Sequence, residues 1–297
     1  MIRLIGMLVG LGFTFVVLLA LAFGIGPAFS TLATHGAFVE PTAEHEFHLH
    51  AHAPEEGFSF DGVGGRWDIV QLQRGYQVYK EVCSACHSLE QVAFRNLADL
   101  GYSDAQIKAE AATWQVPGID PNTGEATTQP GSPTDDFPSP YANDVAAAAA
   151  NNNAIPPDLS LMTKARHNGS QYVYSLLTGY RDPQTFALED GKQLAEEFPN
   201  FETPEGLYFN PYFANLNIAM APPLNPGQVT YADGTEATVS QMSADVAAFL
   251  TWTAEPKMIV RKQTGWWVIA FTLFATILAW FAKKQVWSDA KPKRRKD

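Results

Sequence analysis

The stretch Cys83-Ser84-Ala85-Cys86-His87 has the spacing of a covalent haem attachment site. Two thiols three positions apart can each form a thioether with one haem vinyl group, and the histidine that follows can ligate the iron. A zinc site is one alternative, but it needs a second pair of ligands, and the chain has two cysteines in all. A dithiol redox pair, the other alternative, usually follows a strand in a βαβ pattern, which the sequence lacks there. The motif therefore predicts one covalently attached c-type haem.

An uncharged apolar stretch, Thr264 to Phe281, predicts a membrane-spanning helix. As a helix, these residues are ~27 Å long, close to the ~30 Å of a bilayer core. A buried core helix is the alternative, but cations flank the stretch and tryptophans lie near its ends, where they favour the headgroup level. Seven lysines and arginines follow the stretch and three closely precede it, so the positive-inside rule predicts a cytoplasmic C-terminus. We therefore expect one C-terminal span in a bacterial inner membrane, with the haem domain in the periplasm.

The N-terminus predicts an export signal. Arg3 is followed by the uncharged run Leu4 to Phe23 and then by small residues. We expect residues 1–33 to be removed after export. The run is long for a signal core, so retention as an uncleaved anchor is the alternative.

The segment between the two apolar stretches is strongly acidic. Residues 31–262 contain 29 Asp and Glu against 12 Lys and Arg, a formal charge of −17. Such acidity aids solubility, and it would also steer a basic protein partner towards the domain. We expect no nucleic-acid partner.

Helical patterns separated by long irregular stretches predict a mainly α fold, a c-type cytochrome domain with long loops. Apolar residues recur at helical spacing through residues 66–83 and lead into the haem motif. A late helix is expected to be capped by Ser240 or Ser243, to carry Met242 on its apolar face and to end before Pro256. A helix leading into the haem site and a late helix able to pack across it is the plan of a c-type cytochrome.

Two segments fall outside the helical pattern. Prolines and glycines crowd residues 116–141, which we expect to be a surface loop rather than a core element. Four histidines fall within residues 45–52, joined by His35; they could bind zinc or copper, but we expect a solvated, pH-sensitive arm. The predicted division is 1–33 export signal, 34–65 His-rich acidic arm, 66–257 haem domain, 258–284 transmembrane anchor and 285–297 basic cytoplasmic tail.

The iron needs a sixth ligand or an open position for chemistry. A thioether favours reduced iron and suits electron transfer. The methionine candidates are Met162, Met220, Met242 and Met258. Met220 lies in a segment that two prolines stiffen, whereas Met242 and Met258 fit structural roles. His167 is the rival, as the second ligand of a bis-histidine site.

An ordered set of motifs resembles the cytochrome c1 family, the haem subunit of the quinol–cytochrome c oxidoreductase (bc1) complex. The matching stretches are Leu72–Tyr79, Cys83–Ser88, Val92–Leu97, Ile155–Ser160, Ala165–His167, Ser175–Tyr180, Tyr208–Phe213 and Ala219–Pro223. With the C-terminal anchor they cover residues 66 to 284 in order. The Pro/Gly-rich segment and the N-terminal histidines are not part of this pattern.

The resemblance implies roles for individual residues. His87 and Met220 would be the axial ligands of the iron, and Cys83 and Cys86 would carry the thioethers. The remaining implied haem-pocket positions are Arg166 and Tyr172 beside a propionate, and Asn151, Pro156, Pro157 and Phe213. Some bacterial members close a disulfide with an extra pair of cysteines, which this chain lacks.

The resemblance also implies a function. The protein would pass single electrons from a Rieske iron–sulfur protein to a soluble cytochrome c in a respiratory or photosynthetic chain. It would work beside cytochrome b in a dimeric complex and perform no bond chemistry itself. The alternatives are a free-standing membrane-anchored cytochrome that serves a terminal oxidase, and a haem enzyme such as a peroxidase with an open iron position.

Overall fold

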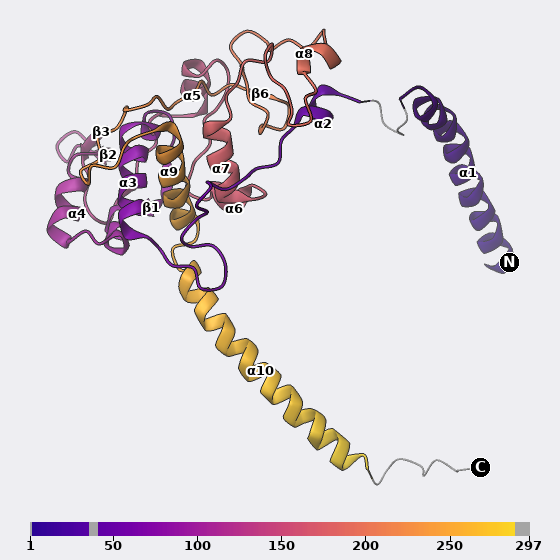
Figure 1. Ribbon diagram of the computed structural model, residues 1–297. Helices are drawn as coiled ribbons and strands as arrows, with labels where there is room; N and C mark the ends of the chain where they lie inside the picture. Colours follow the sequence, from indigo (N-terminus) through magenta and orange to yellow (C-terminus); the bar gives the residue numbers. More distant parts are fainter. Residues whose placement is uncertain (1, 36–40, 289–297) are drawn as a thin grey trace.

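The computed structural model describes residues 2–35 and 41–288, with side chains for 6–25 and 41–288. The predicted mainly α fold is confirmed (Figure 1). The α-helices are α1 (Ile2–His35), α2 (Ala43–Phe47), α3 (Ile69–Glu81), α4 (Asp104–Ala111), α5 (Asp144–Ala150), α6 (Met162–Ala165), α7 (Gly169–Thr178), α8 (Leu194–Glu197), α9 (Val239–Ala254) and α10 (Met258–Val286). Two 3₁₀ segments are η1 (Cys83–Ala85) and η2 (Phe94–Leu100).

The centre of the domain is the packing of α3 against α9. The two helices approach closely at Gly75, where an added Cβ would collide with the backbone of Asp245. Beside this crossing Arg74 donates from Nε to Asp245, whose side chain is fully buried, and from Nη1 to Asp233, both at 2.9 Å. A glycine and a buried ion pair therefore set the distance between the helix that leads into the haem motif and the helix that crosses it.

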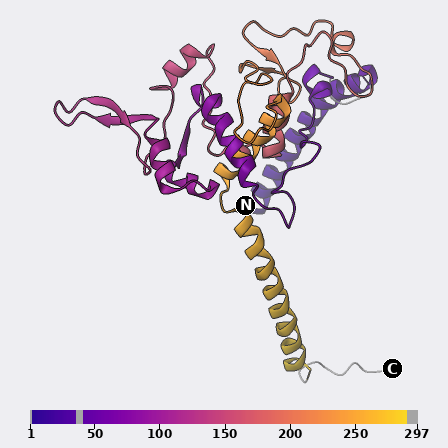
Figure 2. The same cartoon turned by 60° about the vertical axis from the view of Figure 1, so that its left-hand side comes forward.

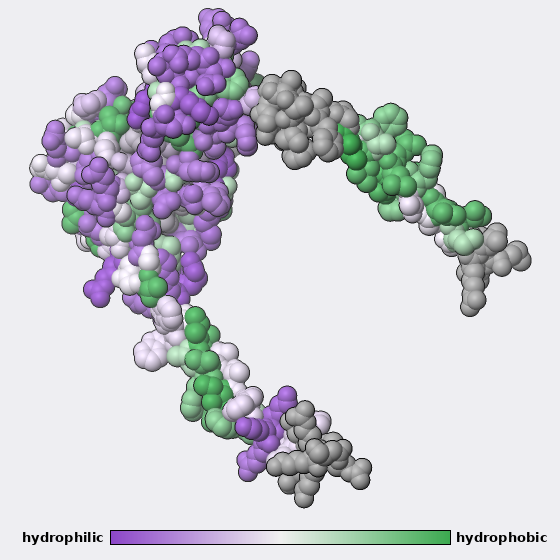
Figure 3. Space-filling model, turned by 45° about the vertical axis from the view of Figure 1, so that its right-hand side comes forward, coloured by the Kyte–Doolittle hydropathy of each residue, from purple (hydrophilic) through white to green (hydrophobic). Residues whose placement is uncertain are grey.

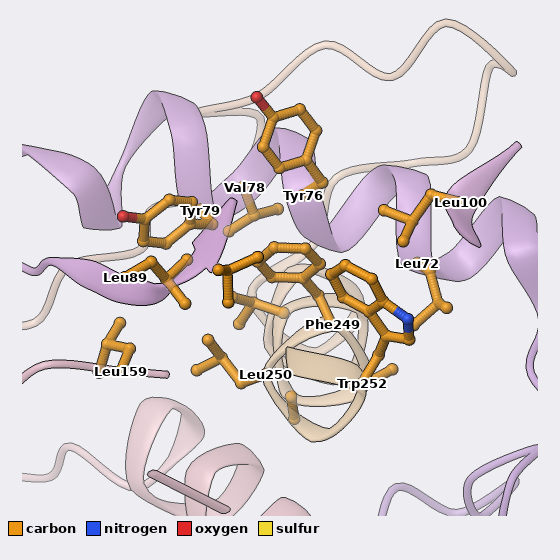
Figure 4. Close-up of a cluster of buried hydrophobic side chains, with 14 of the residues drawn as sticks. Leu72, Tyr76, Val78, Tyr79, Leu89, Leu100, Leu159, Phe249, Leu250 and Trp252 are labelled. Carbon is orange, nitrogen blue, oxygen red and sulfur yellow. The ribbon is translucent and has the colours of Figure 1, made fainter. Parts of the chain in front are cut away.

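Helix α9 is buried around its circumference, from Met242 to Ala254. Figure 4 looks along α9 and shows Phe249 beneath Tyr76 and Tyr79 of α3. The cap differs from the expected serines: Thr238 accepts from the Gln241 amide at 3.0 Å. Because α9 is buried on all sides, its burial gives no single face from which to read its first residue.

Three small antiparallel sheets lie outside this helical centre. Their strands are β1 (Leu89–Ala93) with β4 (Asp136–Phe137), β2 (Gln115–Ile119) with β3 (Ala126–Pro130), and β5 (Tyr208–Phe209) with β6 (Asn217–Ile218).

The segment 116–141, expected to be a surface loop, is exposed through its middle but is not a loop throughout and is not confined to the surface. It contributes to an exposed hairpin, β2–β3, that projects from the domain (Figure 2). Both ends of the segment are in the core, because Val116 and Phe137 are buried, and Phe137 packs against Tyr76 and Phe94. The prolines and glycines here form the turns around a strand pair. They do not keep the whole segment on the surface.

The His-rich arm is also more ordered than expected. Phe47 is fully buried in a second hydrophobic cluster, and Phe58 and Phe60 belong to the main core. The histidines of residues 45–52 are exposed, but the apolar residues between them face inwards. The buried phenylalanines make the arm a packed segment rather than a solvated tail. Among the described residues no group of three or more His, Cys, Asp or Glu could hold a metal ion.

Two described helices are long and apolar enough to cross a membrane: residues Gly6–Ile25 of α1, and α10. Figure 3 shows the apolar surfaces of both beside a largely hydrophilic domain. Helix α10 leaves the base of the domain next to the end of α9, and Lys262 donates to the carbonyls of Phe60 and Gly62 at 2.9 and 3.1 Å. The start of α10 is therefore fixed to the haem domain.

Candidate functional site

The cysteines and His87 lie on a tight turn that ends α3. The amides of Cys86 and His87 both donate to the Cys83 carbonyl, at 3.1 and 2.9 Å. The hydroxyl of Ser84 donates back to the Lys80 carbonyl at 2.7 Å. Because the 3₁₀ turn continues directly from the helix, the packing of α3 fixes the position of both thiols.

The two cysteines are free thiols. Burial, together with the nearby Cys86, raises the pKa of Cys83 to about 12. A dithiol redox pair needs a thiolate of low pKa, so this environment argues against that alternative. The two thiols lie on one turn, where each could form a thioether with a haem.

His87 is held as a neutral imidazole with one defined tautomer. Burial lowers its pKa, and the opposing contributions of the Pro157 carbonyl and of Asp158 are smaller. Nδ1 lies 2.8 Å from the Pro157 carbonyl, which can only accept, so Nδ1 carries the proton. The lone pair is therefore on Nε2, the atom that would face a metal.

Asp158 holds the segment that supplies this carbonyl. One of its oxygens accepts from the Ser88 hydroxyl at 2.9 Å and from the Glu90 amide at 2.8 Å. The Leu159 amide also donates to the Ser88 carbonyl at 3.0 Å. These hydrogen bonds join the residues that follow the haem motif to the Ile155–Ser160 motif. His87 lies between the two.

Met220 lies just after strand β6, in a loop that α7 supports. Tyr180, at the end of α7, donates from its hydroxyl to the Met220 carbonyl at 3.0 Å. Burial, with Tyr172 and Tyr208 nearby, raises the pKa of Tyr180, so the phenol keeps its proton and can donate. The side chain of Met220 is only half-buried.

The other methionines of the domain are used for packing. Met242 and Met258 are buried in the main core, and Met162 packs against it from the edge. Met220 belongs to neither hydrophobic cluster of the described residues. Its thioether is therefore the one that the fold leaves available for another role.

Arg166 and Tyr172 are brought together by the turn between α6 and α7. Burial raises the pKa of Tyr172, and a hydrogen bond and charge interaction with Arg166 oppose that rise. The Arg166 side chain is exposed and also donates to the Ala165 carbonyl at 3.2 Å. An exposed guanidinium beside a phenol is suited to bind a carboxylate such as a haem propionate.

The remaining candidates are less closely connected. Asn151 donates from its side-chain Nδ2 to the Ala147 carbonyl at 2.7 Å, so this side chain bonds within its own helix end. Pro156 is half-buried and Pro157 contributes its carbonyl to His87, while Phe213 is half-buried in the turn between β5 and β6. His167, the rival ligand, is exposed.

A family model described as the cytochrome C1 family matches residues 58–290. The chain belongs to the cytochrome c1 family. It is 46% identical over 239 residues to cytochrome c1 of Rhodospirillum rubrum, covering 80% of this chain and 88% of the relative. It is 42% identical over 243 residues to cytochrome c1 1, heme protein, mitochondrial, of Arabidopsis thaliana, covering 82% and 74%.

A further relative is the cytochrome b/c1 of Bradyrhizobium diazoefficiens. It is 45% identical over 245 residues, which are 80% of this chain and 36% of that longer protein. The comparisons confirm the resemblance that the motifs indicated. They support a haem-containing electron-transfer subunit of the bc1 complex with a membrane anchor.

The donors present fit the c-type haem that the family implies. They comprise two thiols on one turn, an imidazole whose Nδ1 is bonded and whose Nε2 is left for a metal, and a thioether outside both hydrophobic clusters of the described residues. Tyr180 and Asp158 complete this arrangement, yet the sequence alone assigned neither a role. Both lie inside motif stretches, but only the fold shows that each bonds to a segment distant in sequence.

Proposed function

We propose that the protein carries single electrons through one covalently attached haem, from a Rieske iron–sulfur protein to a soluble cytochrome c. Cys83 and Cys86 would hold the haem, and His87 and Met220 would ligate its iron. When bound, the iron supplies the chemistry by changing between the ferric and ferrous states. The match to the cytochrome c1 family over residues 58–290 carries the proposal.

The contribution of His87 follows from its fixed tautomer. The proton on Nδ1 is held by the Pro157 carbonyl, which orients the ring and increases the electron density at Nε2. The lowered pKa keeps the imidazole neutral, so protons do not compete for Nε2 at neutral pH.

Met220 would supply the second protein ligand. A neutral thioether favours the reduced state and raises the reduction potential, which suits a carrier that must accept electrons from an iron–sulfur partner. Two ligands from the protein would also close the iron to exogenous molecules, which suits an electron carrier and not a peroxidase, because a peroxidase needs an open position.

The proposed setting is the bacterial inner membrane. Helix α10 would span it, with Lys283 and Lys284 at the cytoplasmic end, and the acidic haem domain would lie in the periplasm. Residues 1–33 would act in export. Cytochrome b is the proposed partner within the membrane, and the complex would be a dimer.

Purification in mild detergent through a tag on this chain tests the assignment. We expect a two-haem cytochrome b and an iron–sulfur protein to copurify, and the ferrous c-type haem to be silent towards carbon monoxide. Recovery of the chain alone, with an unchanged haem spectrum, would favour the free-standing cytochrome. Ready carbon monoxide binding by the native protein would favour a haem enzyme.

A further inference from the structure

Met220 is attached to a hairpin that has no covalent brace. Strand β6 ends two residues before it, at Ile218, and pairs with β5. The turn between the strands contains Leu216, a buried leucine with a φ of 62°, a backbone conformation that a bulky side chain rarely adopts. Such a residue persists only where its surroundings hold it in place.

Helix α7 supports one side of this hairpin. Asn210 donates from its side chain to the Leu176 carbonyl at 2.8 Å. At Gly179 an added Cβ would collide with the ring of Tyr212. These contacts fix the base of the hairpin to the end of α7, next to Tyr180.

The N-terminal arm covers the hairpin from another side. Phe47 packs edge-on against Phe186 and Phe198, at centroid distances of 6.2 and 5.9 Å. The same cluster contains Phe209 of β5 and the strained Leu216. One buried ring of the arm therefore belongs to the core that encloses the turn.

Hydrogen bonds hold the arm to both the hairpin and α7. The Leu49 amide donates to the Pro211 carbonyl at 2.8 Å. His52 and Ser175 bond reciprocally, the His52 amide to the serine hydroxyl at 2.8 Å and that hydroxyl to the His52 carbonyl at 3.1 Å. The His52 ring also packs against Tyr212 at 5.6 Å. The arm thus bridges the hairpin and the helix that supports it.

We propose that residues 43–52 form a strap that holds the β5–β6 hairpin closed and thereby positions Met220, with Phe47 as the main positioning residue. The proposal rests on the assignment of Met220 as the sixth ligand. The chain has no cysteines beyond the haem motif, so no disulfide can brace the hairpin. The strap shifts the population towards the state in which Met220 reaches the iron, because only that state encloses Phe47 and Leu216 together.

The test is Phe47→Ala in the full-length, haem-loaded protein within its detergent-solubilised complex. We expect the ferric absorption band of a methionine-ligated haem to weaken and the reduction potential to fall. We expect the fraction of ferrous haem that binds carbon monoxide to rise at least about tenfold. A tenfold shift corresponds to ~1.4 kcal/mol. Loss of the Phe47 ring therefore needs to destabilise the closed state, relative to the open state, by only that part of the lost packing energy.

Leu100→Ala is the matched control. Leu100 is also fully buried, but it lies in the main core and not in the cluster of Phe47. It should lower the stability of the domain and leave the potential and the carbon monoxide response unchanged. If both variants bind carbon monoxide equally, general loosening explains the effect and the strap is overturned.

A second variant covers the case in which Phe47→Ala is not recovered with haem. Leu49→Pro removes the amide proton that Pro211 accepts, and His48 already has the extended backbone that a residue before proline adopts (φ −73°, ψ 118°). Leu49→Pro should lower the reduction potential and raise the fraction of ferrous haem that binds carbon monoxide, as Phe47→Ala should. A wild-type response would overturn the strap.

Met220→Leu, measured beside these variants, separates the two proposals. If Met220→Leu binds carbon monoxide and the strap variants do not, the strap is wrong and the ligand assignment stands. If Met220→Leu itself stays silent, the ligand assignment is wrong, and the strap proposal falls with it.

Discussion

His87 and Met220 differ in how the fold controls them. The histidine is fixed through its own ring, because Nδ1 donates to the Pro157 carbonyl at 2.8 Å. The methionine is fixed through its backbone, because Tyr180 donates to its carbonyl at 3.0 Å and the side chain belongs to neither core cluster. We therefore expect the Met220 side of the haem to be the one that small structural changes disturb.

Replacing Met220 with Leu should lower the reduction potential while the haem stays covalently attached. Attachment depends on Cys83 and Cys86, which the substitution leaves intact. Leucine has no lone pair, so the preference for reduced iron is lost, and each ~59 mV of decrease is a tenfold change in a one-electron equilibrium. Redox titration and the carbon monoxide spectrum of the ferrous protein measure the effect.

Met162→Leu is the control, since Met162 packs against the main core. It should leave both measurements unchanged. An unchanged potential in Met220→Leu would mean that another residue is the ligand: Met162 if the control variant lowers the potential, and otherwise His167 as the next to test.

At the scale of the elements, the sequence predicted the helices whose pattern is local. The helix expected within residues 66–83 is α3, Ile69–Glu81, and the late helix is α9, Val239–Ala254. Its cap was predicted wrongly, because Ser240 pairs with the hydroxyl of Tyr174 and leaves capping to Thr238. That pairing is a tertiary contact with a residue distant in sequence, so the residues around position 240 could not predict it.

The corrections at residues 116–141 and in the arm have the same cause. Phe137 and Phe47 are isolated aromatic residues in segments rich in proline, glycine or histidine, so composition predicts exposure. Each becomes buried because a distant element supplies its partners, Tyr76 of α3 for Phe137 and Phe186 for Phe47. His87 and Met220 could be proposed as ligands from the motifs, whereas their supports at Asp158 and Tyr180 required the fold.

Helix α4 is joined to α3 by one carboxylate, Glu110, and this contact predicts a pH dependence. Lys80, Tyr76 and Trp114 all direct a donor at Glu110, at 2.6, 2.6 and 3.1 Å. Burial favours the protonated acid, but the hydrogen bonds outweigh it and lower the pKa of Glu110 below its ordinary 4.5. The native state therefore binds fewer protons than the unfolded state in this range, and stability falls as the pH falls below 4.5.

Glu110→Gln should lower the free energy of unfolding by about 1–2 kcal/mol at neutral pH, since it weakens charge-assisted hydrogen bonds. The difference from the wild type should shrink as the pH falls through the lowered native pKa, where the wild type loses the same charge. Urea unfolding of the haem-loaded protein from neutral into acid conditions checks this. A difference that grows in acid would contradict the assignment.

At the scale of the whole molecule, the described contacts between the anchor and the haem domain are confined to the start of α10, where Met258 is buried in the main core and Arg261 pairs with Glu255. Lys262 lies in α10 but bonds to Phe60 and Gly62 of the domain. A chain ended after Gln263, with the N-terminal segment removed by export, should be a soluble, haem-loaded domain. Fractionation of the truncated protein tests this, and recovery only with membranes would mean that α10 is not the sole tether.

The charge of the domain predicts salt-dependent electron transfer. Residues 31–262 carry −17, which can attract a basic cytochrome over a Debye length of about 8–10 Å near physiological ionic strength. Oxidation of the haem by a basic soluble cytochrome c should therefore slow as salt rises. Stopped-flow rates that are equal at low and high salt would show that the acidity serves solubility alone.

We propose that this chain relays electrons out of an iron–sulfur protein. The most direct test is the rate at which quinol reduces the c-type haem in the purified complex, measured before and after removal of the iron–sulfur subunit. We predict rapid reduction in the complete complex, near-complete loss of it in the depleted complex, and recovery when the subunit is added back. Quinol-driven reduction at the same rate in the depleted complex would contradict the account.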